Sequence, residues 1–403
     1  AAPALPRAKV RRMGVFPVGT GRHNAHMSQR DVAIVLSGGG VNGVLLELGF
    51  LRRLRASALW PRVACIYGTS AGALTGTMAA LDRLDELEEF TLGLQPRDIF
   101  APQRLWQLPL NGLHHYALPG TIAERLLEPH ELARALAASP IEVVVFATDV
   151  SEHEETSHEL SYSSHETPPE TMAQAVLASA AISALVLPVA VGERIATDGG
   201  WVRNFPLGCA VERPGVELVV ALRHVPRYPS VDVEPLVRLR RRLQRFRAAP
   251  PVRALIAQLD EAEARGRRGE PVHLGDMLVR LMRVTIQRNT ALEERLAAER
   301  DAACRELEAL RADLVRLARE HARPGRRARA ARAVEDRFAR TALPRTVPQI
   351  VVRGSAGADS LDQRFRGSPE WTERAKRALI VRGFEAADAE LRAFDAGLLE
   401  QAS

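Results

Sequence analysis

The first ninety residues alternate short apolar runs with glycine-rich turns and apolar helical patterns. Residues 31–36 (DVAIVL) and 63–67 (VACIY) are apolar runs, and helical patterns follow them over 44–54 and 73–81. A short apolar run bounded by glycine is typical of a strand that is buried on both faces. Two strand–turn–helix units in succession predict a parallel sheet covered by helices.

Further strands are indicated later in the chain. Residues 141–147 (IEVVVFA) and 218–222 (LVVAL) have the same apolar character, and a helical pattern lies between them near 172–181. A short strand pattern over 194–196 precedes an Asp-Gly-Gly turn. We therefore predict an α/β fold with a parallel-rich central sheet sandwiched by helices.

After about residue 229 the chain consists largely of Arg, Glu, Ala and Leu, with almost no strand pattern. This predicts an all-helical region over 235–343, as an insertion in the α/β fold or an extension of it. A largely apolar stripe at three–four spacing marks one long helix that ends at Pro324–Gly325. Its members are Leu278, Met282, Thr285, Asn289, Leu292, Leu296, Ala303, Leu307, Leu310, Leu314 and Leu317. The stripe suits packing on the α/β domain or on a second subunit, and both stay open.

The tail returns to α/β character, with a strand pattern over 347–352 and a helical pattern over 371–391. We expect a catalytic domain over 31–230 that is completed by a strand and helix within 344–403, with the helical region between them. Residues 1–30 contain no Asp or Glu and several Arg. They form a leader or disordered segment, and sequence upstream of a natural start at Met27 explains them better than a transit-like leader.

Composition narrows the class of protein. Hydrophobic residues make up 46% and charged residues 26%, as in a soluble globular protein. The three cysteines have neither disulfide nor zinc spacing, which favours a reducing compartment such as the cytoplasm. No apolar run reaches the length of a membrane span, and no segment has the form of a signal peptide.

The net charge of +6 could favour an anionic partner. The chain has only two lysines, however, and is rich in alanine, which indicates a general compositional bias. We expect no nucleic-acid partner. One face of the helical region could bind a lipid surface, or could simply be solvated. That face carries Arg238, Arg240, Arg241, Arg242, Arg245 and Arg247, opposite Leu236, Leu239, Leu243 and Phe246.

Three constellations carry candidate chemistry, and the first is the glycine loop at Gly38, Gly39, Gly40, Val41, Asn42 and Gly43. Backbone amides of such a loop at the start of a helix point at one spot and favour negative charge there. The string also satisfies the Gly-x-Gly-x-x-Gly pattern of dinucleotide sites. Such a site expects an acidic residue at the end of the second strand, where this chain has Ile66, Tyr67 and Gly68. We therefore expect no dinucleotide cofactor.

The second constellation is Gly68-Thr69-Ser70-Ala71-Gly72, between a buried strand and an apolar helix. A nucleophilic serine needs a sharp turn that exposes its hydroxyl over the sheet edge, and small neighbours permit that turn. The alternative is an ordinary turn, since Gly-x-Ser-x-Gly also occurs by chance. Its position between strand and helix favours a nucleophile at Ser70, flanked by Gly68 and Gly72.

The third constellation is Thr197-Asp198-Gly199-Gly200. Asp-Gly alone indicates only a turn. Beside the other two constellations, the carboxylate of Asp198 becomes a candidate base for Ser70, with Gly199 and Gly200 in support.

With these three motifs in this order, the chain resembles the patatin-like phospholipases. The resemblance covers about residues 31–225, and it is supported by Ala147-Thr148-Asp149 and Asn204-Phe205-Pro206-Leu207. It implies a carboxylic ester hydrolase in which Ser70 and Asp198 form a dyad and Gly38, Gly39 and Gly40 form the oxyanion loop. Family members usually have Arg or Lys where this chain has Asn42. The segment 183–188 is also a loose match.

The implied mechanism is acyl transfer in two steps. Asp198 accepts the Ser70 proton, Ser70 attacks an ester carbonyl, and water activated by Asp198 releases the acyl group. The order Ser, Asp, His also occurs in α/β-hydrolase triads, so His224 is an alternative base. As a residue next to a strand, His224 is more simply explained as a structural histidine.

No metal is expected. His153, His158 and His165 match no metal-ligand spacing and are interpreted as a solvated loop with a short strand, while His114 and His115 are interpreted as a loop pair. The predicted function is hydrolysis of a fatty acyl ester in a phospholipid, lysophospholipid or neutral lipid. The alternative is a non-catalytic scaffold that assembles through its long helices and has lost activity through changes such as Asn42.

Overall fold

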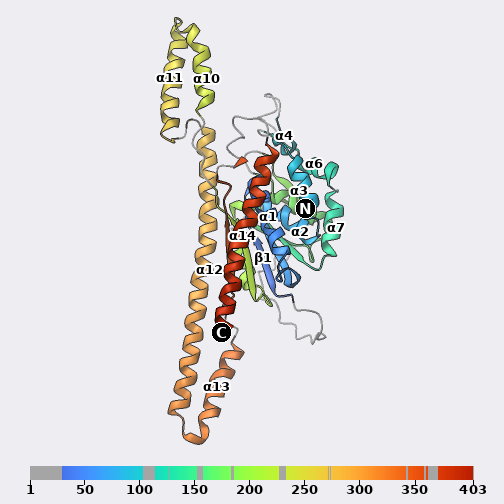
Figure 1. Ribbon diagram of the computed structural model, residues 1–403, viewed down its shortest axis with the longest axis vertical. Helices are drawn as coiled ribbons and strands as arrows, with labels where there is room; N and C mark the ends of the chain where they lie inside the picture. Colours follow the sequence, from blue (N-terminus) through green and yellow to red (C-terminus); the bar gives the residue numbers. More distant parts are fainter. Residues whose placement is uncertain are drawn as a thin grey trace, which may run out of the picture.

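The computed structural model describes residues 30–102, 114–126, 128–151, 158–182, 186–226, 233–270, 272, 274–341, 344–357, 360–361 and 371–402. A central sheet carries helices on both faces, and two helical extensions project beyond it at opposite ends (Figure 1). The α/β class predicted from the sequence is confirmed.

The central sheet is parallel-rich. Its strands follow the order β10-β9-β1-β2-β5-β8-β7, and β6 pairs with β5. Neighbouring strands among β10, β9, β1, β2 and β5 pair in parallel, whereas β6 and β8 pair antiparallel with β5, and β7 pairs antiparallel with β8. The strands are β1 (Val32–Leu36), β2 (Val63–Thr69), β5 (Glu142–Asp149), β6 (Glu159–Ser163), β7 (Val189–Val191), β8 (Arg194–Asp198), β9 (Leu218–His224) and β10 (Gln349–Gly354).

The helices around the sheet include counterparts of the helical patterns over 44–54, 73–81, 172–181 and 371–391, and several that the sequence patterns did not indicate. They are α1 (Gly40–Arg55), α2 (Ala71–Ala80), α3 (Leu84–Gly93), α4 (Pro96–Ile99), α6 (Leu118–Arg125), α7 (Pro129–Ala137), α8 (Pro169–Ser179), α9 (Leu207–Glu212) and α14 (Glu373–Ala402). Short 3-10 helices cover Trp60–Arg62 (η1) and Gly199–Trp201 (η3). A small separate sheet joins β3 (Phe100–Pro102) and β4 (His114–Tyr116). His114 and His115 therefore lie in a strand, and their interpretation as a loop pair was wrong because a three-residue edge strand has too little periodicity to recognise.

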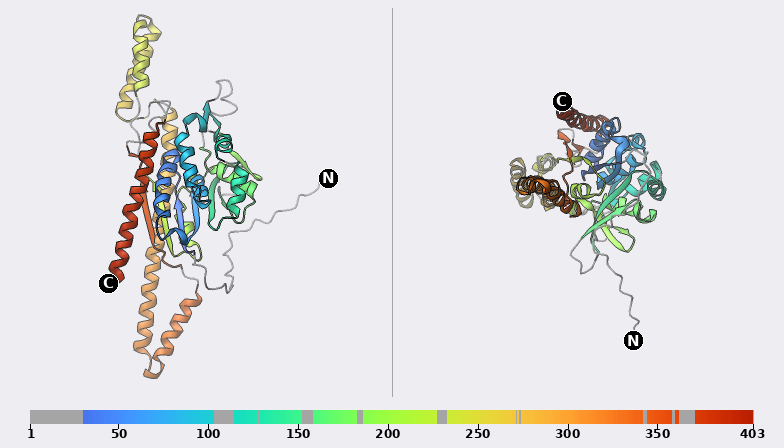
Figure 2. Two further views of the ribbon diagram at one scale, coloured as in Figure 1. Left: turned by 45° about the vertical axis from the view of Figure 1, so that its right-hand side comes forward. Right: turned by 90° about the horizontal axis from the view of Figure 1, so that it is seen from below.

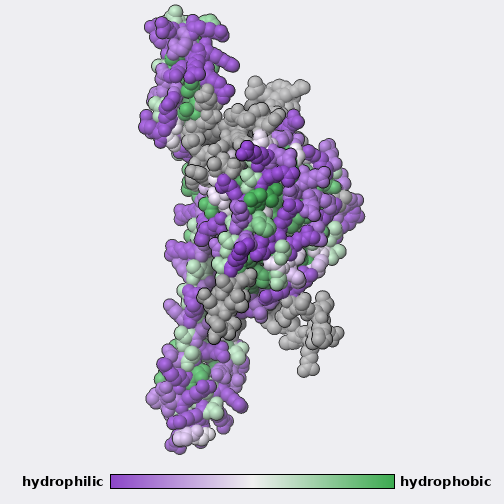
Figure 3. All heavy atoms as spheres, in the orientation of Figure 1, coloured by the Kyte–Doolittle hydropathy of each residue, from purple (hydrophilic) through white to green (hydrophobic). Residues whose placement is uncertain are grey.

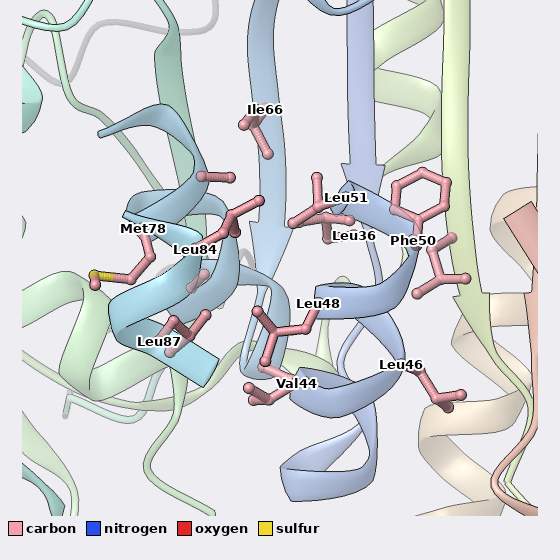
Figure 4. Close-up of a cluster of buried hydrophobic side chains, with 14 of the residues drawn as sticks. Leu36, Val44, Leu46, Leu48, Phe50, Leu51, Ile66, Met78, Leu84 and Leu87 are labelled. Carbon is pink, nitrogen blue, oxygen red and sulfur yellow. The ribbon is translucent and has the colours of Figure 1, made fainter. Parts of the chain in front are cut away.

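Alternating side chains of the strands supply two apolar layers. Ile34 and Leu36 face α1, α2 and α3, and the resulting cluster is the larger one (Figure 4). Ala33 and Val35 face the opposite layer, which contains α9 and the middle of the long helix α12 (Leu274–His321). The sheet is thus buried on both sides, as its continuous apolar strands require.

The tail of the chain completes this arrangement. Strand β10 is paired in parallel with β9, and α14 packs along α1. In Figure 2, α14 and α12 both lie near the β10 edge of the sheet, but they cover opposite faces of it, because α14 packs in the layer of α1 and α12 in the layer of α9. The central sheet therefore contains strands that precede the long helical region in the sequence and a strand that follows it.

The helical region projects from the body in two hairpins. At one end, α10 (Glu234–Leu243) and α11 (Pro250–Arg267) form the hairpin at the top of Figure 1. At the other end, α12 turns back through the 3-10 helix η5 (Pro324–Arg326) into α13 (Arg327–Arg340). Both hairpins have a mainly hydrophilic surface in the view of Figure 3.

The turn between α10 and α11 is strongly basic. Residues 235–259 contain no acidic residue. We call five exposed arginines near this turn the hairpin arginines: Arg241, Arg242, Arg245, Arg247 and Arg253. Phe246, at 54% exposure, lies among them. No described helix is long and apolar enough to cross a membrane.

Leucines of the α12 stripe are exposed to solvent. Leu292, Leu296 and Leu310 are 43%, 60% and 50% exposed. The opposite face of the helix, with Thr290, Ala297 and Cys304, is buried instead. The stripe allowed packing on the α/β domain or on a second subunit. For these leucines, only contact with another molecule is still a prediction.

Candidate active site

Ser70 occupies the sharp turn between β2 and α2. Its φ of 55° lies in the left-handed region, which a residue with a side chain rarely adopts. The two glycines of the motif permit this turn, because a Cβ on Gly68 would lie 2.3 Å from Gly72 O and one on Gly72 would lie 2.5 Å from Leu36 O. The local structure is the strand-to-helix elbow that the motif predicts, and α2 begins at the next residue with its positive helix end beside the hydroxyl.

Asp198 lies at the end of β8 and directly faces this serine. Ser70 Oγ donates a hydrogen bond to Asp198 Oδ2 at 2.7 Å. The other carboxylate oxygen, Oδ1, accepts from the backbone N–H of Gly200 at 2.7 Å, which fixes the orientation of the carboxylate. Both side chains are largely buried, with 6% exposure for Ser70 and 8% for Asp198. Two residues 128 positions apart are thus within hydrogen-bonding distance.

Burial changes the acid–base chemistry of Asp198. Loss of solvent raises the pKa of its carboxyl from 3.8 to about 6, although the hydrogen bonds from Ser70 and Gly200 oppose the rise. The carboxylate is therefore a stronger base than an exposed aspartate and is still ionised at neutral pH. A base with this pKa is suited to accept a proton from a hydroxyl near neutral pH.

The glycine loop lies against the serine, but its amides are not equivalent. A Cβ on Gly38 would lie 3.3 Å from Ser70 Cβ, which places the loop beside Ser70. The N–H of Gly38 itself donates to Asn204 O at 3.1 Å. The structure thus corrects the expectation that Gly38, Gly39 and Gly40 all present free amides, because the amide of Gly38 is already used in the fold. Gly39 caps α1 and Gly40 is its first residue, and the amides at a helix start have no partner within the helix.

Asn42 does not face the glycine loop. It is buried, and its amide donates to Ser360 Oγ at 3.1 Å while its carbonyl oxygen accepts from Leu361 N at 2.9 Å. The neutral side chain thus fastens residues 360–361 to the first turn of α1. Gly43 is close to Ala71, where an added Cβ would lie 3.0 Å from the alanine side chain, so it allows α1 to approach α2.

His224 does not join the serine and the aspartate. Its backbone N–H donates to Ser37 Oγ at 2.7 Å, and its Nε2 has no hydrogen-bond partner among the described residues. The ring packs beneath the glycine loop, since a Cβ on Gly39 would lie 2.9 Å from its Cγ. Burial, and secondly the charge of Arg283, lower the pKa of His224 to about 4. The imidazole is therefore neutral at neutral pH, and the direct Ser70–Asp198 contact leaves it no place in a triad.

Several site residues have no signal in the sequence motifs. Ser179, at the end of α8, accepts a hydrogen bond from Ser70 N at 2.9 Å and donates to Phe146 O at 2.6 Å, so it holds the strained turn. Thr69 donates to Arg203 O at 2.7 Å. Thr148, in one of the segments that support the resemblance, donates to Asp198 O at 2.7 Å. These contacts join residues that are distant in the chain, which spacing alone does not predict.

An apolar pocket lies among α2, α3, α6, α7 and α8, and its lining includes neither Ser70 nor Asp198. Leu74 lies one helical turn after Ser70 on α2, and Leu177 lies two residues before Ser179 on α8. The hydroxyl of Thr77, the single polar side chain of the lining, donates to Ala73 O and is satisfied. The apolar pocket is lined by Leu74, Thr77, Met78, Leu87, Phe90, Ile122, Leu126, Pro129, Leu132, Ala133, Leu136, Met172, Ala173, Val176 and Leu177.

The described residues contain no group of His, Cys, Asp and Glu that could hold a metal ion. His158 is hydrogen-bonded through Nδ1 to Asp149 O, and His165 through Nε2 to Ser139 O, both at 3.0 Å. These two histidines are therefore tied to backbone carbonyls. His153 lies outside the described residues.

Comparison with known proteins agrees with this geometry over the first half of the chain. Residues 34–211 match the model of the patatin-like phospholipase family. No curated protein matches the chain. Among solved structures, VipD from Legionella pneumophila is similar at 14% sequence identity and a TM-score of 0.41, over 91% of this chain and 67% of that one.

Proposed function

We propose that this protein is a serine-dependent lipid acyl hydrolase in which Ser70 is the nucleophile and Asp198 the general base. The observation that carries the proposal is the 2.7 Å hydrogen bond from Ser70 Oγ to a carboxylate buried beside it. The match of residues 34–211 to the patatin-like phospholipases supports the same reaction class. A strained serine turn is costly to maintain, and such strain is concentrated at functional sites.

The reaction proceeds through an acyl-enzyme. Asp198 takes the Ser70 proton as Oγ attacks the ester carbonyl, and the new oxyanion is held by the amides of Gly39 and Gly40. Asp198 then returns the proton to the departing alcohol. Water attacks the acyl-enzyme, again giving its proton to Asp198, and the carboxylic acid leaves as Ser70 is restored. Base assistance of this kind is worth roughly 100- to 10,000-fold in rate.

The apolar pocket supports a fatty acyl group as the part of the substrate that is recognised. Its lining offers no unsatisfied polar side chain to a ligand, so it suits hydrocarbon rather than a head group. Each buried methylene contributes about 0.8 kcal/mol. Met78 and Met172 are unbranched and can adjust their shape as a chain enters.

Contact with an anionic lipid surface is proposed for the hairpin arginines. They form a basic group around Phe246 that no acidic residue interrupts over residues 235–259. A cluster of basic side chains near anionic lipid gains about 1 kcal/mol per charge, and an exposed aromatic ring adds apolar contact. This contact would bring the enzyme to its substrate without changing the chemistry at Ser70.

A non-catalytic scaffold is the alternative function, and one assay separates the two. We expect turnover of a chromogenic acyl ester by the wild-type protein and loss of that turnover in Ser70→Ala. Equal rates in both proteins would favour the scaffold. His224→Asn is a companion variant that we expect to retain the rate, because His224 accepts no proton in the proposed mechanism.

A further inference from the structure

The long helix α12, which lies outside the segment matched by the family model, is in contact with the catalytic centre. Its residues 289–293 pack against residues 199–208, the stretch that follows Asp198. Asn289 donates a hydrogen bond from its side chain to Trp201 O. Thr290 Oγ1 accepts from the side-chain amide of Asn204 at 2.9 Å. The helix thus contacts the backbone and side chains that come directly after the proposed base.

An ion pair reinforces this contact. Arg203 lies between Glu159 and Glu293, and it is hydrogen-bonded to both carboxylates. The second oxygen of Glu293 accepts from Gly208 N at 3.4 Å. Removal of Arg203 would leave the mostly buried carboxylate of Glu293 without its charge partner, whereas removal of Glu293 would leave Arg203 paired with Glu159 alone.

Residues 199–208 also bond to the glycine loop and to the Ser70 turn. Asn204 O accepts the N–H of Gly38, and Arg203 O accepts the hydroxyl of Thr69, the residue before Ser70. Asn204 Oδ1 occupies the space that a Cβ on Gly38 would fill, 2.4 Å away. Asn204 and Arg203 therefore link α12 to the glycine loop and to the serine turn.

The direction of α12 places this contact at the catalytic edge of the sheet. Asp301 accepts from Gln349 at the start of β10, whereas Glu294 accepts from Arg223 near the end of β9. The helix therefore runs antiparallel to these strands, and its residues 289–294 lie level with their carboxyl ends. In an α/β sheet this is the edge at which sites form.

We propose that Thr290 and Glu293 of α12 are positioning residues for the reaction, acting through Asn204 and Arg203 on the glycine loop and the Ser70 turn. This inference rests on the proposed function. Thr290 is fully buried and Asn204 is 3% exposed, so their hydrogen bond is shielded from water. Oxyanion donors stabilise a transition state only when they are correctly placed, and a shift of about 1 Å can cost roughly 100-fold in rate.

The test compares two threonines of the same helix. Thr290→Val keeps the shape but removes the acceptor for Asn204, and Thr290→Ser restores a hydroxyl. Thr285 is the matched control, because it also bonds to the carbonyl four residues earlier but is exposed. We expect Thr290→Val to lower kcat for a short chromogenic ester about 10- to 100-fold with little change in KM. Thr290→Ser and Thr285→Val should keep the wild-type kcat.

A second readout does not depend on turnover. We expect Thr290→Val to accelerate hydrogen–deuterium exchange in the peptide that contains Gly38–Gly40, while Thr285→Val leaves that exchange unchanged. If Thr290→Val is not folded under assay conditions, Glu293→Gln, which keeps the shape and removes the charge, takes its place with the same expectations. The acid limb of the pH–rate profile should stay at the wild-type position, because Asp198 is not touched.

Wild-type kcat and unaltered exchange in Thr290→Val would overturn the inference, as would an equal loss in Thr285→Val. A loss of kcat that only follows the unfolded fraction would overturn it as well. An inactive wild-type protein would instead refute the proposed function. In that case faster exchange at Gly38–Gly40 in Thr290→Val would still support the link from α12 to the glycine loop, and unchanged exchange would overturn it.

Discussion

Replacement of Asp198 by asparagine should abolish catalysis and, at alkaline pH, stabilise the fold. Asparagine has nearly the same shape, and its Oδ1 can still accept the N–H of Gly200. Its amide nitrogen would face Ser70 Oγ and cannot take a proton. Because base assistance is lost, we expect the rate of ester hydrolysis to fall roughly 100- to 10,000-fold.

The stability change follows from the pKa of the buried carboxyl. The pKa of Asp198 is about 6 in the folded protein against 3.8 when it is solvated, a difference worth about 3 kcal/mol. A folded pKa above the unfolded pKa means that the carboxyl favours folding below pH 3.8, and that this contribution disappears as pH rises through about 6. Asparagine does not ionise, so the variant has no stability contribution from residue 198 that could disappear over this pH range.

Two measurements on Asp198→Asn test this reasoning. Urea unfolding at about pH 8 and about pH 4.5 should show that the stability gain of the variant over wild type is larger at the higher pH, by about 2 kcal/mol. Turnover of a chromogenic ester at about pH 8 should be lost in the same sample. The reasoning is refuted if the variant keeps more than about a tenth of the wild-type rate. It is also refuted if the free energy of unfolding changes equally at both pH values.

Four further outcomes are expected. Below about pH 6 the kcat of the wild-type enzyme should fall about tenfold per pH unit, as Asp198 becomes protonated; a flat kcat profile down to about pH 4.5 would exclude this base. Ala173→Phe, which fills the apolar pocket, should lower kcat/KM for long-chain esters by about fourfold for each methylene that no longer fits, and short-chain esters should be spared. Ala137→Phe, at an exposed position, is the control for that series, and equal chain-length profiles in both variants would remove the pocket from substrate recognition. Burial raises the pKa of Glu47 from 4.5 to about 8, so its contribution to stability is present below pH 4.5 and is lost as pH rises through about 8, and urea unfolding of Glu47→Gln should show a stability gain over wild type at about pH 9 that exceeds the gain at about pH 4 by up to roughly 5 kcal/mol. Exchange of the hairpin arginines for glutamine in a Ser70→Ala background should abolish co-sedimentation with anionic vesicles at low salt, and undiminished binding would place the lipid contact elsewhere.

The positions of Ser70 and Asp198 could be predicted because their signals are local. The glycines around Ser70 are required by the approach of two backbone segments within the elbow, and they are adjacent in the sequence. The buried strands β1 and β2 have continuous apolar runs that few other structures fit. The contact between serine and aspartate needed the resemblance to a family, because no local pattern joins residues 128 positions apart.

The environment of the site could not be predicted from the same patterns. Ser179 and Thr290 look like ordinary polar residues of helices, and only their tertiary partners give them a role. The leucine stripe of α12 dominated its hydrophobic pattern, yet the helix packs through the face of Thr290 and Ala297, where a buried hydrogen bond with Asn204 lies beside apolar contacts. Periodicity detects apolar faces and is insensitive to a buried face that is partly polar.

The sequence could not predict which amides of the glycine loop are free to bind a substrate, because this depends on backbone hydrogen bonds within the fold. Its composition indicates several amides directed at one point, but it does not tell which amides the fold itself uses. The N–H of Gly38 is bonded to Asn204, so the stretch after Asp198 determines which donors are left for a substrate. The proposed oxyanion site therefore depends on a segment far from the glycines in sequence.

The most direct test of the central claim is covalent labelling of Ser70 by a fluorophosphonate, followed by peptide mapping and mass spectrometry. If the buried carboxylate of Asp198 activates the hydroxyl that is bonded to it, the wild-type protein forms one adduct, on Ser70. The same reaction is slow in Asp198→Asn and gives no such adduct in Ser70→Ala. A wild-type protein that stays unmodified at Ser70, or that reacts there as fast without the Asp198 carboxylate as with it, contradicts the account.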